Sequence, residues 1–249
     1  MTASAGGTLH GRVAIVTGGG RRVGRAIAIA LGAAGARVAV HYQDSAAGAR
    51  ETIAAIGRDR GEARAFKANL LEPDAGARLV DDVVEAFGRP AILVNSAASM
   101  LRTPLDSVTV AEWDEVFALN LRAPFFLSLA AARAMGDEGG AIVNISDHMG
   151  FESWPAFVPH GVSKAAVAAM TRALAGALAP RVRVNAVAPG AVLLPEGTSA
   201  ATEAKLAGET PLQRIGSPED VAQAALYFVH APYVTGETLF VDGGRHGAR

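Results

Sequence analysis

The 249-residue sequence predicts one α/β domain, in which about seven mostly parallel strands form a doubly wound sheet with helices on both faces. Short apolar runs alternate with longer helical patterns along the chain, which is typical of βαβ units. Most of the short runs lack polar alternation, as do strands that are buried on both faces. No linker, repeat or low-complexity block divides the chain, so we expect a single domain over residues 1–249.

The expected elements follow one another in alternating order. We expect strands, from short apolar runs, at Val13–Thr17, Arg37–His41, Arg64–Lys67, Ala91–Val94, Ala141–Ile145, Arg183–Val187 and Thr238–Val241. We expect helices at Val23–Ala34, Ala46–Arg58, Pro73–Phe87, Ala111–Met135, Val162–Leu178 and Pro218–Phe228. Gly35, Gly61 and Gly88 each follow one of these helices, where glycine commonly ends a helix.

Residues 191–216 interrupt the alternation. They follow Pro189-Gly190 and contain only a short helical pattern around Thr202–Leu206. A segment of this length beside the strand ends is often functional, so we expect a substrate loop or lid. The alternative is a plain surface insertion.

Composition restricts the class of protein. Half of the residues are hydrophobic, 19% are charged, and the net charge is −1, which gives no reason to expect nucleic acid or an anionic membrane as a partner. The absence of cysteine excludes disulfides and thiolate metal sites, and we expect no metal. We find neither a signal-peptide pattern nor about 20 uninterrupted apolar residues. These observations favour a cytoplasmic protein with a small-molecule substrate.

Two segments carry chemistry. Val13–Gly24 is a strand that runs into a glycine-rich turn and a helix, the context in which backbone N–H groups bind a pyrophosphate. Farther along, Asp147 ends a strand region, and His160 and Lys164 lie four positions apart on one helix face. His148 is an alternative acid, although strand alternation would place it on the opposite side from Asp147 if the strand persists to it.

The glycine turn resembles that of the short-chain dehydrogenase/reductase family. It matches the Thr-Gly-x-x-x-Gly-x-Gly form at Thr17, Gly18 and Gly24, and Arg22 replaces the middle glycine. Further tracts that are similar to that family are Asn95–Ala98, Pro189-Gly190 and Val234–Gly244. The resemblance implies a single Rossmann-type, NADP-binding reductase domain.

The catalytic positions differ from that family's Ser, Tyr and Lys. Asp147 stands at the Ser position, His160 stands at the Tyr position thirteen residues later, and Lys164 is unchanged. Arg22 in the turn and Asp147 are features of the pteridine reductase branch, which this chain resembles. Substrates of that branch present C=N bonds that need a proton on nitrogen, and a carboxyl group can relay it.

The resemblance also implies roles for two further groups. Lys164 would bind the nicotinamide ribose hydroxyls, and the backbone carbonyl of Asn120 would hold a water in a proton relay to the lysine. No tyrosine lies near this segment, so an imidazole at His160 must do any work of the missing phenol.

The expected cofactor is NADPH. Enzymes that use NAD place a carboxylate at the end of the second strand, whereas NADP enzymes offer positive charge. Here Tyr42 occupies that position, Arg21 stands where NADP-dependent relatives carry a basic residue, and Asp44 counts against the preference. In the alternative interpretation, Arg21 and Arg22 are solvated surface charges. The expected cofactor contacts are Gly18, Arg21, Arg22, Val23, His41, Tyr42, Ser45, Asn69, Leu70, Asn95, Ser96, Ala97, Lys164, Pro189 and Gly190.

Met100, Trp154 and Leu193 are the expected substrate contacts. Met100 falls where pteridine reductases have an aromatic side chain that stacks on the pterin, and methionine covers a ring less specifically. Trp154 could supply an aromatic wall instead.

Three functions follow from these residues. The first is an NADPH-dependent reductase of a C=N bond in an imine or pterin-like substrate. The second is a ketone or aldehyde reductase with His160 as the acid, and the third is a non-catalytic NADP-binding protein. The retained Asn120 and Lys164 favour an enzyme. Relatives are commonly tetramers, so the resemblance also implies a homotetramer.

Overall fold

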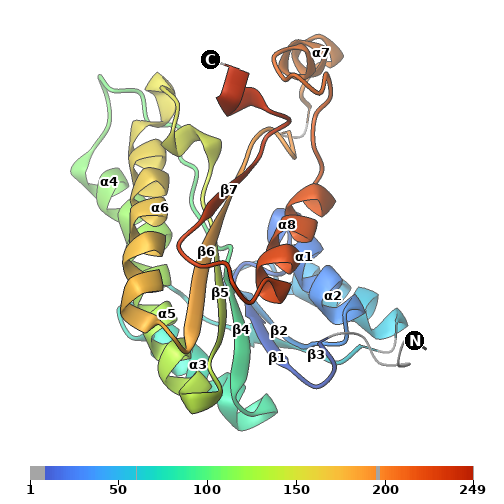
Figure 1. The fold of residues 1–249 in the computed structure, drawn as a ribbon. Helices are drawn as coiled ribbons and strands as arrows, with labels where there is room; N and C mark the ends of the chain where they lie inside the picture. Colours follow the sequence, from blue (N-terminus) through green and yellow to red (C-terminus); the bar gives the residue numbers. More distant parts are fainter. Residues whose placement is uncertain (1–8, 60, 195–196, 249) are drawn as a thin grey trace.

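Seven parallel strands form the central layer of the structure (Figure 1), which confirms the expected fold class. The computed structural model describes residues 9–59, 61–194 and 197–248. The strands are β1 Val13–Val16, β2 Arg37–Tyr42, β3 Ala63–Lys67, β4 Pro90–Asn95, β5 Gly140–Ile145, β6 Val182–Pro189 and β7 Thr238–Val241. Their order in the sheet is β3-β2-β1-β4-β5-β6-β7.

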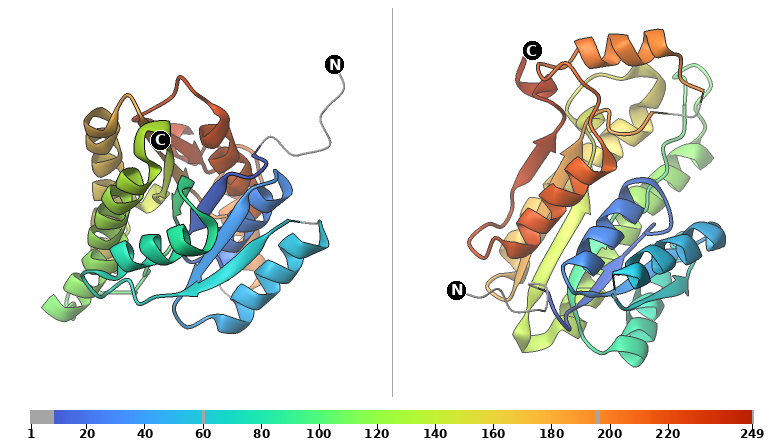
Figure 2. Two further views of the ribbon diagram at one scale, coloured as in Figure 1. Left: turned by 90° about the horizontal axis from the view of Figure 1, so that it is seen from below. Right: turned by 90° about the vertical axis from the view of Figure 1, so that its right-hand side faces the viewer.

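Helices cover both faces of this sheet (Figures 1 and 2). On one face α1, α2 and α8 pack together, and on the other α3, α4, α5 and α6 do so. Their bounds are α1 Arg22–Ala33, α2 Ala46–Arg58, α3 Ala75–Phe87, α4 Val110–Phe117, α5 Ala123–Met135, α6 Val158–Leu178, α7 Ala200–Gly208 and α8 Pro218–His230. The helix α7 lies beyond the carboxyl ends of the strands, beside the C-terminal segment (Figure 2).

The hydrophobic core consists of two layers, one on each face of the sheet. Successive strand residues point to opposite faces, so in β1 the side chains of Ala14 and Val16 join the layer beneath α1 and α8. Val13 and Ile15 join the layer beneath α3, α5 and α6. Burial on both faces explains why these strands lack polar alternation in the sequence.

The strand order reverses between β1 and β4, and this reversal positions the site. From β1 the chain builds outward through β2 and β3, then returns to add β4 on the other side. A crevice forms at the carboxyl ends of the strands at such a point. Thr17 spans it, because its Oγ1 accepts hydrogen bonds from the backbone N–H groups of Ser96 and Ala97 at 2.9 and 3.0 Å.

One expected helix is interrupted. The helix expected over Ala111–Met135 consists of α4, a π-helical turn at Ala118–Arg122, and α5. Asn120 lies in that turn and its side chain bonds the main chain of Ser99, a contact that the local sequence does not predict. The helix α6 begins at Val158 rather than Val162, with a proline in its first turn, where proline is tolerated.

The run Val110–Glu138 has a mean hydropathy of 1.3, and its length and composition alone would allow it to cross a bilayer. It packs against α3, α6 and β4 within the helical layer. A buried core helix passes the same test of length and composition, so this feature is weak evidence for a membrane span.

A buried histidine holds the glycine turn after β1. The backbone N–H of Gly18 donates to His41 Nδ1 at 3.2 Å, and His41 Nε2 lies 3.1 Å from the carbonyl oxygen of Ala68. These partners require a lone pair on Nδ1 and a proton on Nε2, which is the neutral ring. Burial lowers the pKa of His41 below 6.5, and the bond to Ala68 opposes this only in part.

We expect His41 to make the folded protein less stable in mild acid. In the unfolded chain this histidine takes up a proton near pH 6.5, whereas in the folded protein it stays neutral to lower pH. The free energy of unfolding therefore falls as the pH drops from about 6.5 towards the folded-state pKa, by up to about 1.4 kcal/mol per pH unit. Urea unfolding of His41→Gln at pH 7.5, 6.5 and 5.5 should give a flatter pH dependence than the wild type. His10→Gln, at an exposed residue, is the control. An unchanged slope in His41→Gln would contradict this role.

We expect Gly24→Ala to destabilise the protein by about 1–3 kcal/mol, because the added Cβ would overpack the contact between α1 and the glycine turn. An added Cβ would collide with the carbonyl oxygen of Gly18 and would lie 3.1 Å from Ser96 Oγ. The matched control is Gly57→Ala on α2, where a Cβ meets nothing within 4 Å, and it should stabilise by about 0.5–1 kcal/mol. Urea unfolding of both variants tests the contrast, and equal effects of the two substitutions would refute it.

Candidate functional site

A cavity of about 660 Å³ lies at the carboxyl ends of the strands. Its walls come from the glycine turn, the end of β2, the loop after β5, α6 and the segment that follows β6. This volume lies in the range of small-molecule and cofactor sites. Most of the residues expected from the sequence line it, namely Gly18, Arg21, Arg22, Val23, His41, Tyr42, Ser45, Leu70, Ser96, Ala97, Met100, Asp147, Trp154, His160, Lys164, Pro189, Gly190 and Leu193.

Asn69, Asn95 and Asn120 do not line the cavity, in contrast to the contacts expected for the first two. Asn95 donates to Asn144 Oδ1 at 2.8 Å and to Ser128 Oγ at 3.1 Å, so it ties β4 to β5 and α5. Asn69 Oδ1 accepts from the backbone N–H of Leu71 at 3.2 Å. These amides support the walls, because their hydrogen bonds are made within the protein.

The glycine turn fits the diphosphate of a dinucleotide. No side chain caps the N-terminus of α1, and its first turn contains no acidic residue, so its free N–H groups and partial positive charge are open to an anion. Arg21 and Arg22 at this end are exposed and line the cavity. Arg22 has a φ of 53°, in the left-handed region that favours glycine, and its Nη2 donates to the carbonyl oxygen of Leu193 at 3.4 Å.

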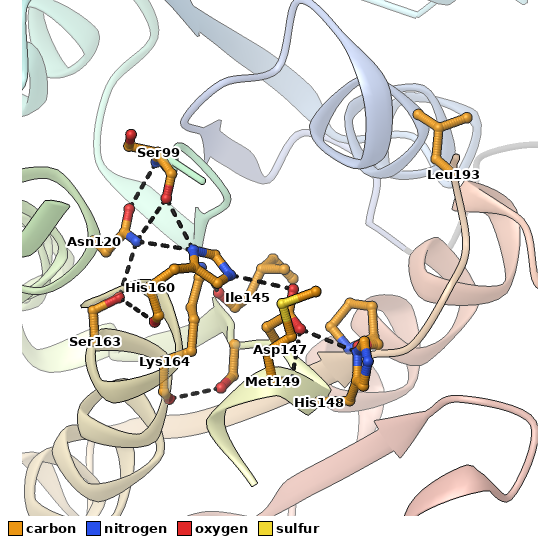
Figure 3. Close-up of polar contacts among 12 residues, drawn as sticks. Ser99, Asn120, Ile145, Asp147, His148, Met149, His160, Ser163, Lys164 and Leu193 are labelled. Atoms are coloured by element: carbon orange, nitrogen blue, oxygen red, sulfur yellow. Dashed lines mark hydrogen bonds and ion pairs between the residues drawn. The ribbon is translucent and has the colours of Figure 1, made fainter. Parts of the chain in front are cut away.

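Asp147 is the centre of the catalytic end (Figure 3). Its Oδ1 accepts from the backbone N–H of Met149 at 2.8 Å and lies 3.1 Å from His148 Nδ1. Its Oδ2 lies 3.5 Å from His160 Nε2. Burial acts to raise the pKa of this carboxyl, but the adjacent imidazoles of His148 and His160 outweigh it and hold the pKa well below its usual range. Asp147 is therefore an ionised acceptor at neutral pH.

His160 lies between two acceptors on the first turn of α6. Its Nδ1 is 3.0 Å from the carbonyl oxygen of Ser99, and its Nε2 faces Asp147. The 3.5 Å separation from Asp147 is an ion-pair distance without hydrogen-bond geometry, so Nε2 has no hydrogen-bond partner. The site therefore has an acceptor for a proton on either ring nitrogen, Ser99 O beside Nδ1 and the Asp147 carboxylate beside Nε2.

Asn120 contacts His160 directly, with its Nδ2 3.5 Å from His160 Nδ1, and also through Ser99 (Figure 3). Its Oδ1 accepts from Ser99 N at 2.8 Å, and its Nδ2 donates to the carbonyl oxygen of Ser99 at 2.9 Å and to Ser163 Oγ at 3.0 Å. These bonds fix the carbonyl that faces His160 Nδ1. The side chain is buried, so its effect on the cavity is one of positioning.

Lys164 enters the site from the next turn of α6. Its Nζ donates to the carbonyl oxygen of Ile145 at 2.8 Å. Burial lowers the pKa of Lys164 to about 8, against an opposing effect of the Asp147 charge. The lysine remains mainly protonated at pH 7 while needing little change to release its proton.

His148 faces the same cavity as Asp147, because the strand does not persist to it. The strand β5 ends at Ile145, and a 3-10 turn at His148–Gly150 brings the imidazole to the same cavity as Asp147. Its Nδ1 lies 3.1 Å from the carbonyl oxygen of Pro189 and 3.1 Å from Asp147 Oδ1. Burial acts to lower the pKa of His148, but contact with Asp147 raises it above the usual value.

Arg245 closes the far end of the cavity, and no signal in the sequence pointed to it. Its guanidinium is buried, pairs with Glu152 at 3.3 Å and Glu209 at 2.8 Å, and lies 5.5 Å from the centre of the Trp154 ring. Three segments meet there: the loop after β5, the chain after α7, and the C-terminal segment. Among the described residues, no group of three or more His, Cys, Asp or Glu side chains is placed to hold a metal ion.

Sequence comparison identifies related proteins along nearly the whole chain. The family profile described as Enoyl-(Acyl carrier protein) reductase matches residues 19–246. An uncharacterised oxidoreductase of Mycobacterium tuberculosis is 39% identical over 95% of this chain and 92% of its own. The 3beta-hydroxysteroid dehydrogenase 1 of Eggerthella lenta is 38% identical over 95% and 94%. The 3-oxoacyl-[acyl-carrier-protein] reductase of Synechocystis is 35% identical over 95% and 97%.

Solved structures show the same fold. A protein of Sinorhizobium meliloti that is described as a short-chain alcohol dehydrogenase by assignment superposes with a TM-score of 0.90 at 35% identity. The match covers 96% of this chain and 98% of that protein. A 7α-hydroxysteroid dehydrogenase in complex with NADH gives 0.91 at 32% identity, over 98% of both chains. A blue fluorescent protein from a metagenomic library, in complex with NADPH, gives 0.88 at 31% identity over 95% and 98%. On these matches and its parallel sheet, this chain belongs to the short-chain dehydrogenase/reductase family of oxidoreductases.

Proposed function

We propose that this protein is an NADPH-dependent ketone or aldehyde reductase in which His160 delivers the proton. The observation that carries the proposal is the pairing of His160 with an ionised Asp147. The related steroid dehydrogenase and 3-oxoacyl reductase are named for hydroxyl and ketone chemistry, which supports this substrate class over the imine or pterin-like substrate expected from the sequence.

The charge of Asp147 supports His160 over Asp147 as the acid. A carboxyl whose pKa is held far below its usual range has no proton to give at neutral pH. His160 carries that proton on Nε2, and Asp147 stabilises the charged ring and orients it. When the cofactor is bound, its nicotinamide supplies a hydride to the carbonyl carbon. His160 then protonates the carbonyl oxygen, so the product is an alcohol and the imidazole is left neutral.

Lys164 and Asn120 complete the proposed arrangement. The ammonium of Lys164 is held by Ile145 O at the cavity wall, where it would bind ribose hydroxyls and keep the site positive. Asn120 fixes Ser99 O and so the orientation of the His160 ring. Because both groups are engaged with this ring and cavity, they support an enzyme over a non-catalytic NADP-binding protein.

NADPH is the proposed cofactor because the cavity offers positive charge where a 2′-phosphate would lie. Arg21, Tyr42 and Ser45 line this end, and β2 ends in Tyr42 rather than in a carboxylate. Asp44 also lines the cavity, and its negative charge opposes the preference. Solved relatives contain NADPH in one case and NADH in another, so the side chains of this chain must decide.

Reduction of a C=N bond is the second candidate, and the ionised Asp147 favours it in one respect. A protonated imine or the ring N–H of a pterin-like substrate can donate a hydrogen bond to a carboxylate, whereas a carbonyl oxygen cannot. In that case Asp147 would hold the substrate nitrogen, and its removal would harm imine reduction more than ketone reduction.

We also propose a homotetramer in the cytoplasm. Val110, Trp113 and Phe126 expose large apolar surfaces on α4 and α5, and such surfaces favour burial against another copy. Light scattering coupled to gel filtration measures the assembly directly.

For ketones, we expect His160→Gln to lower kcat/KM by about 10²–10⁴-fold, because a positioned acid contributes this much. Asp147→Asn should lose less with ketones and more with cyclic imines or dihydropterins. The measurement is NADPH oxidation with each of these three substrate classes, in variants whose affinity for NADPH equals that of the wild type. If His160→Gln retains full ketone reductase activity, His160 is not the acid. If no substrate class is turned over by a wild-type protein that binds NADPH, the non-catalytic hypothesis replaces both enzymes.

We expect NADPH to bind about tenfold or more tightly than NADH, because Arg21 gains a charge-assisted phosphate contact. Fluorescence titration of both cofactors measures the ratio. Arg21→Ala should remove most of the preference, and Asp44→Asn should increase it by removing the opposing charge. Equal affinities in the wild type, or an unchanged ratio in Arg21→Ala, would rule out this account.

A further inference from the structure

We infer that His148 is a positioning residue that forms, with Asp147 and His160, one proton-holding unit in which both imidazoles share a single carboxylate. This inference rests on the proposed role of His160 as the proton donor. His148 would hold the carboxylate in place and, through its own charge, adjust how readily His160 releases its proton.

The geometry places a proton on His148 Nδ1. That nitrogen lies 3.1 Å from Pro189 O and 3.1 Å from Asp147 Oδ1, and both oxygens are acceptors. The ring meets Trp154 edge to face, with 5.6 Å between centroids and 89° between planes. Backbone carbonyl, carboxylate and indole together hold the imidazole, with Nδ1 in hydrogen-bond geometry to Pro189 O and at ion-pair distance from Asp147 Oδ1 (Figure 3).

The two oxygens of Asp147 are divided between the two histidines. Oδ1 receives His148 and the N–H of Met149, and Oδ2 faces His160. Without His148, Oδ1 keeps the Met149 bond alone, and the carboxylate gains freedom to turn away from His160. The longer distance on the His160 side, 3.5 Å against 3.1 Å, makes that contact the one most easily lost.

Charge couples the two rings. One carboxylate cannot neutralise two imidazolium rings, so a positive His148 weakens the hold of Asp147 on the His160 proton. The other charged groups near this unit are Glu152, in the loop after β5; Lys164, on α6; and Arg245, which packs against Trp154. Glu152 favours the charged form of His148, as Asp147 does.

Two substitutions separate position from charge. His148→Leu removes both, whereas His148→Asn keeps a neutral N–H donor near the place of Nδ1. We expect His148→Leu to lower kcat about 10-fold or more, as loss of an orienting partner does elsewhere, with NADPH affinity unchanged. His148→Asn should restore kcat to within about threefold, while the midpoint of its pH–rate profile moves upward, because the positive neighbour is gone.

The matched control is His246→Asn. His246 also pairs with an aspartate through Nδ1, at 2.9 Å from Asp242 Oδ2, but it lies outside the cavity that contains His160. This variant should leave both kcat and the pH midpoint unchanged.

Nitrogen-15 NMR of histidine-labelled protein tests the coupling without turnover. The His160 signals are identified by their loss in His160→Gln, and we expect their titration midpoint to move upward in His148→Asn but not in His246→Asn. The inference is overturned if the His160 titration is the same in wild type and His148→Asn, or if His148→Asn behaves like His148→Leu in kcat. A shifted NMR titration together with full activity in His160→Gln would retain the coupling and refute only the proposed proton donor.

Discussion

The ionised carboxylate of Asp147 is the group on which the rest of the site depends. It lies just beyond the end of β5, accepts one backbone N–H, and faces an imidazole on each side. Because a buried charge is costly unless it is paired, the two histidines and the carboxylate require one another. Three side chains share the charge here, so the acidity of this site is set by their ion pairs.

The sequence predicts the sheet well because its signals are local. Each strand is a short apolar run, and each run appears in the sheet within two residues of its expected bounds at either end. The interrupted helix was missed because the π-helical turn depends on Asn120 bonding Ser99, twenty-one residues away. The start of α6 was placed four residues late, since Val158 and Pro159 carry no distinct capping signal in the sequence.

The site was predicted less completely, for reasons that differ between residues. Asp147, His160 and Lys164 were found by their spacing, which a helix and a strand end convert directly into proximity. The side on which His148 lies depends on where β5 ends, and the local sequence does not mark that end at Ile145. Arg245 was absent from the expectation because its partners, Glu152 and Glu209, come from two distant segments. Contacts of that kind follow from tertiary packing and leave no local pattern.

The placement of Arg245 has a consequence for how substrate preference could diverge among proteins of this architecture. The groups proposed to transfer the proton lie just after β5 and on α6, whereas Arg245, which also lines the cavity, comes from the C-terminal segment and pairs with Glu152 and Glu209. Exchange of a few residues in that segment would reshape the wall around Trp154 and leave the proton-transfer groups in place. Chemistry and selectivity are thus encoded in separate parts of the chain, and each is free to vary without the other.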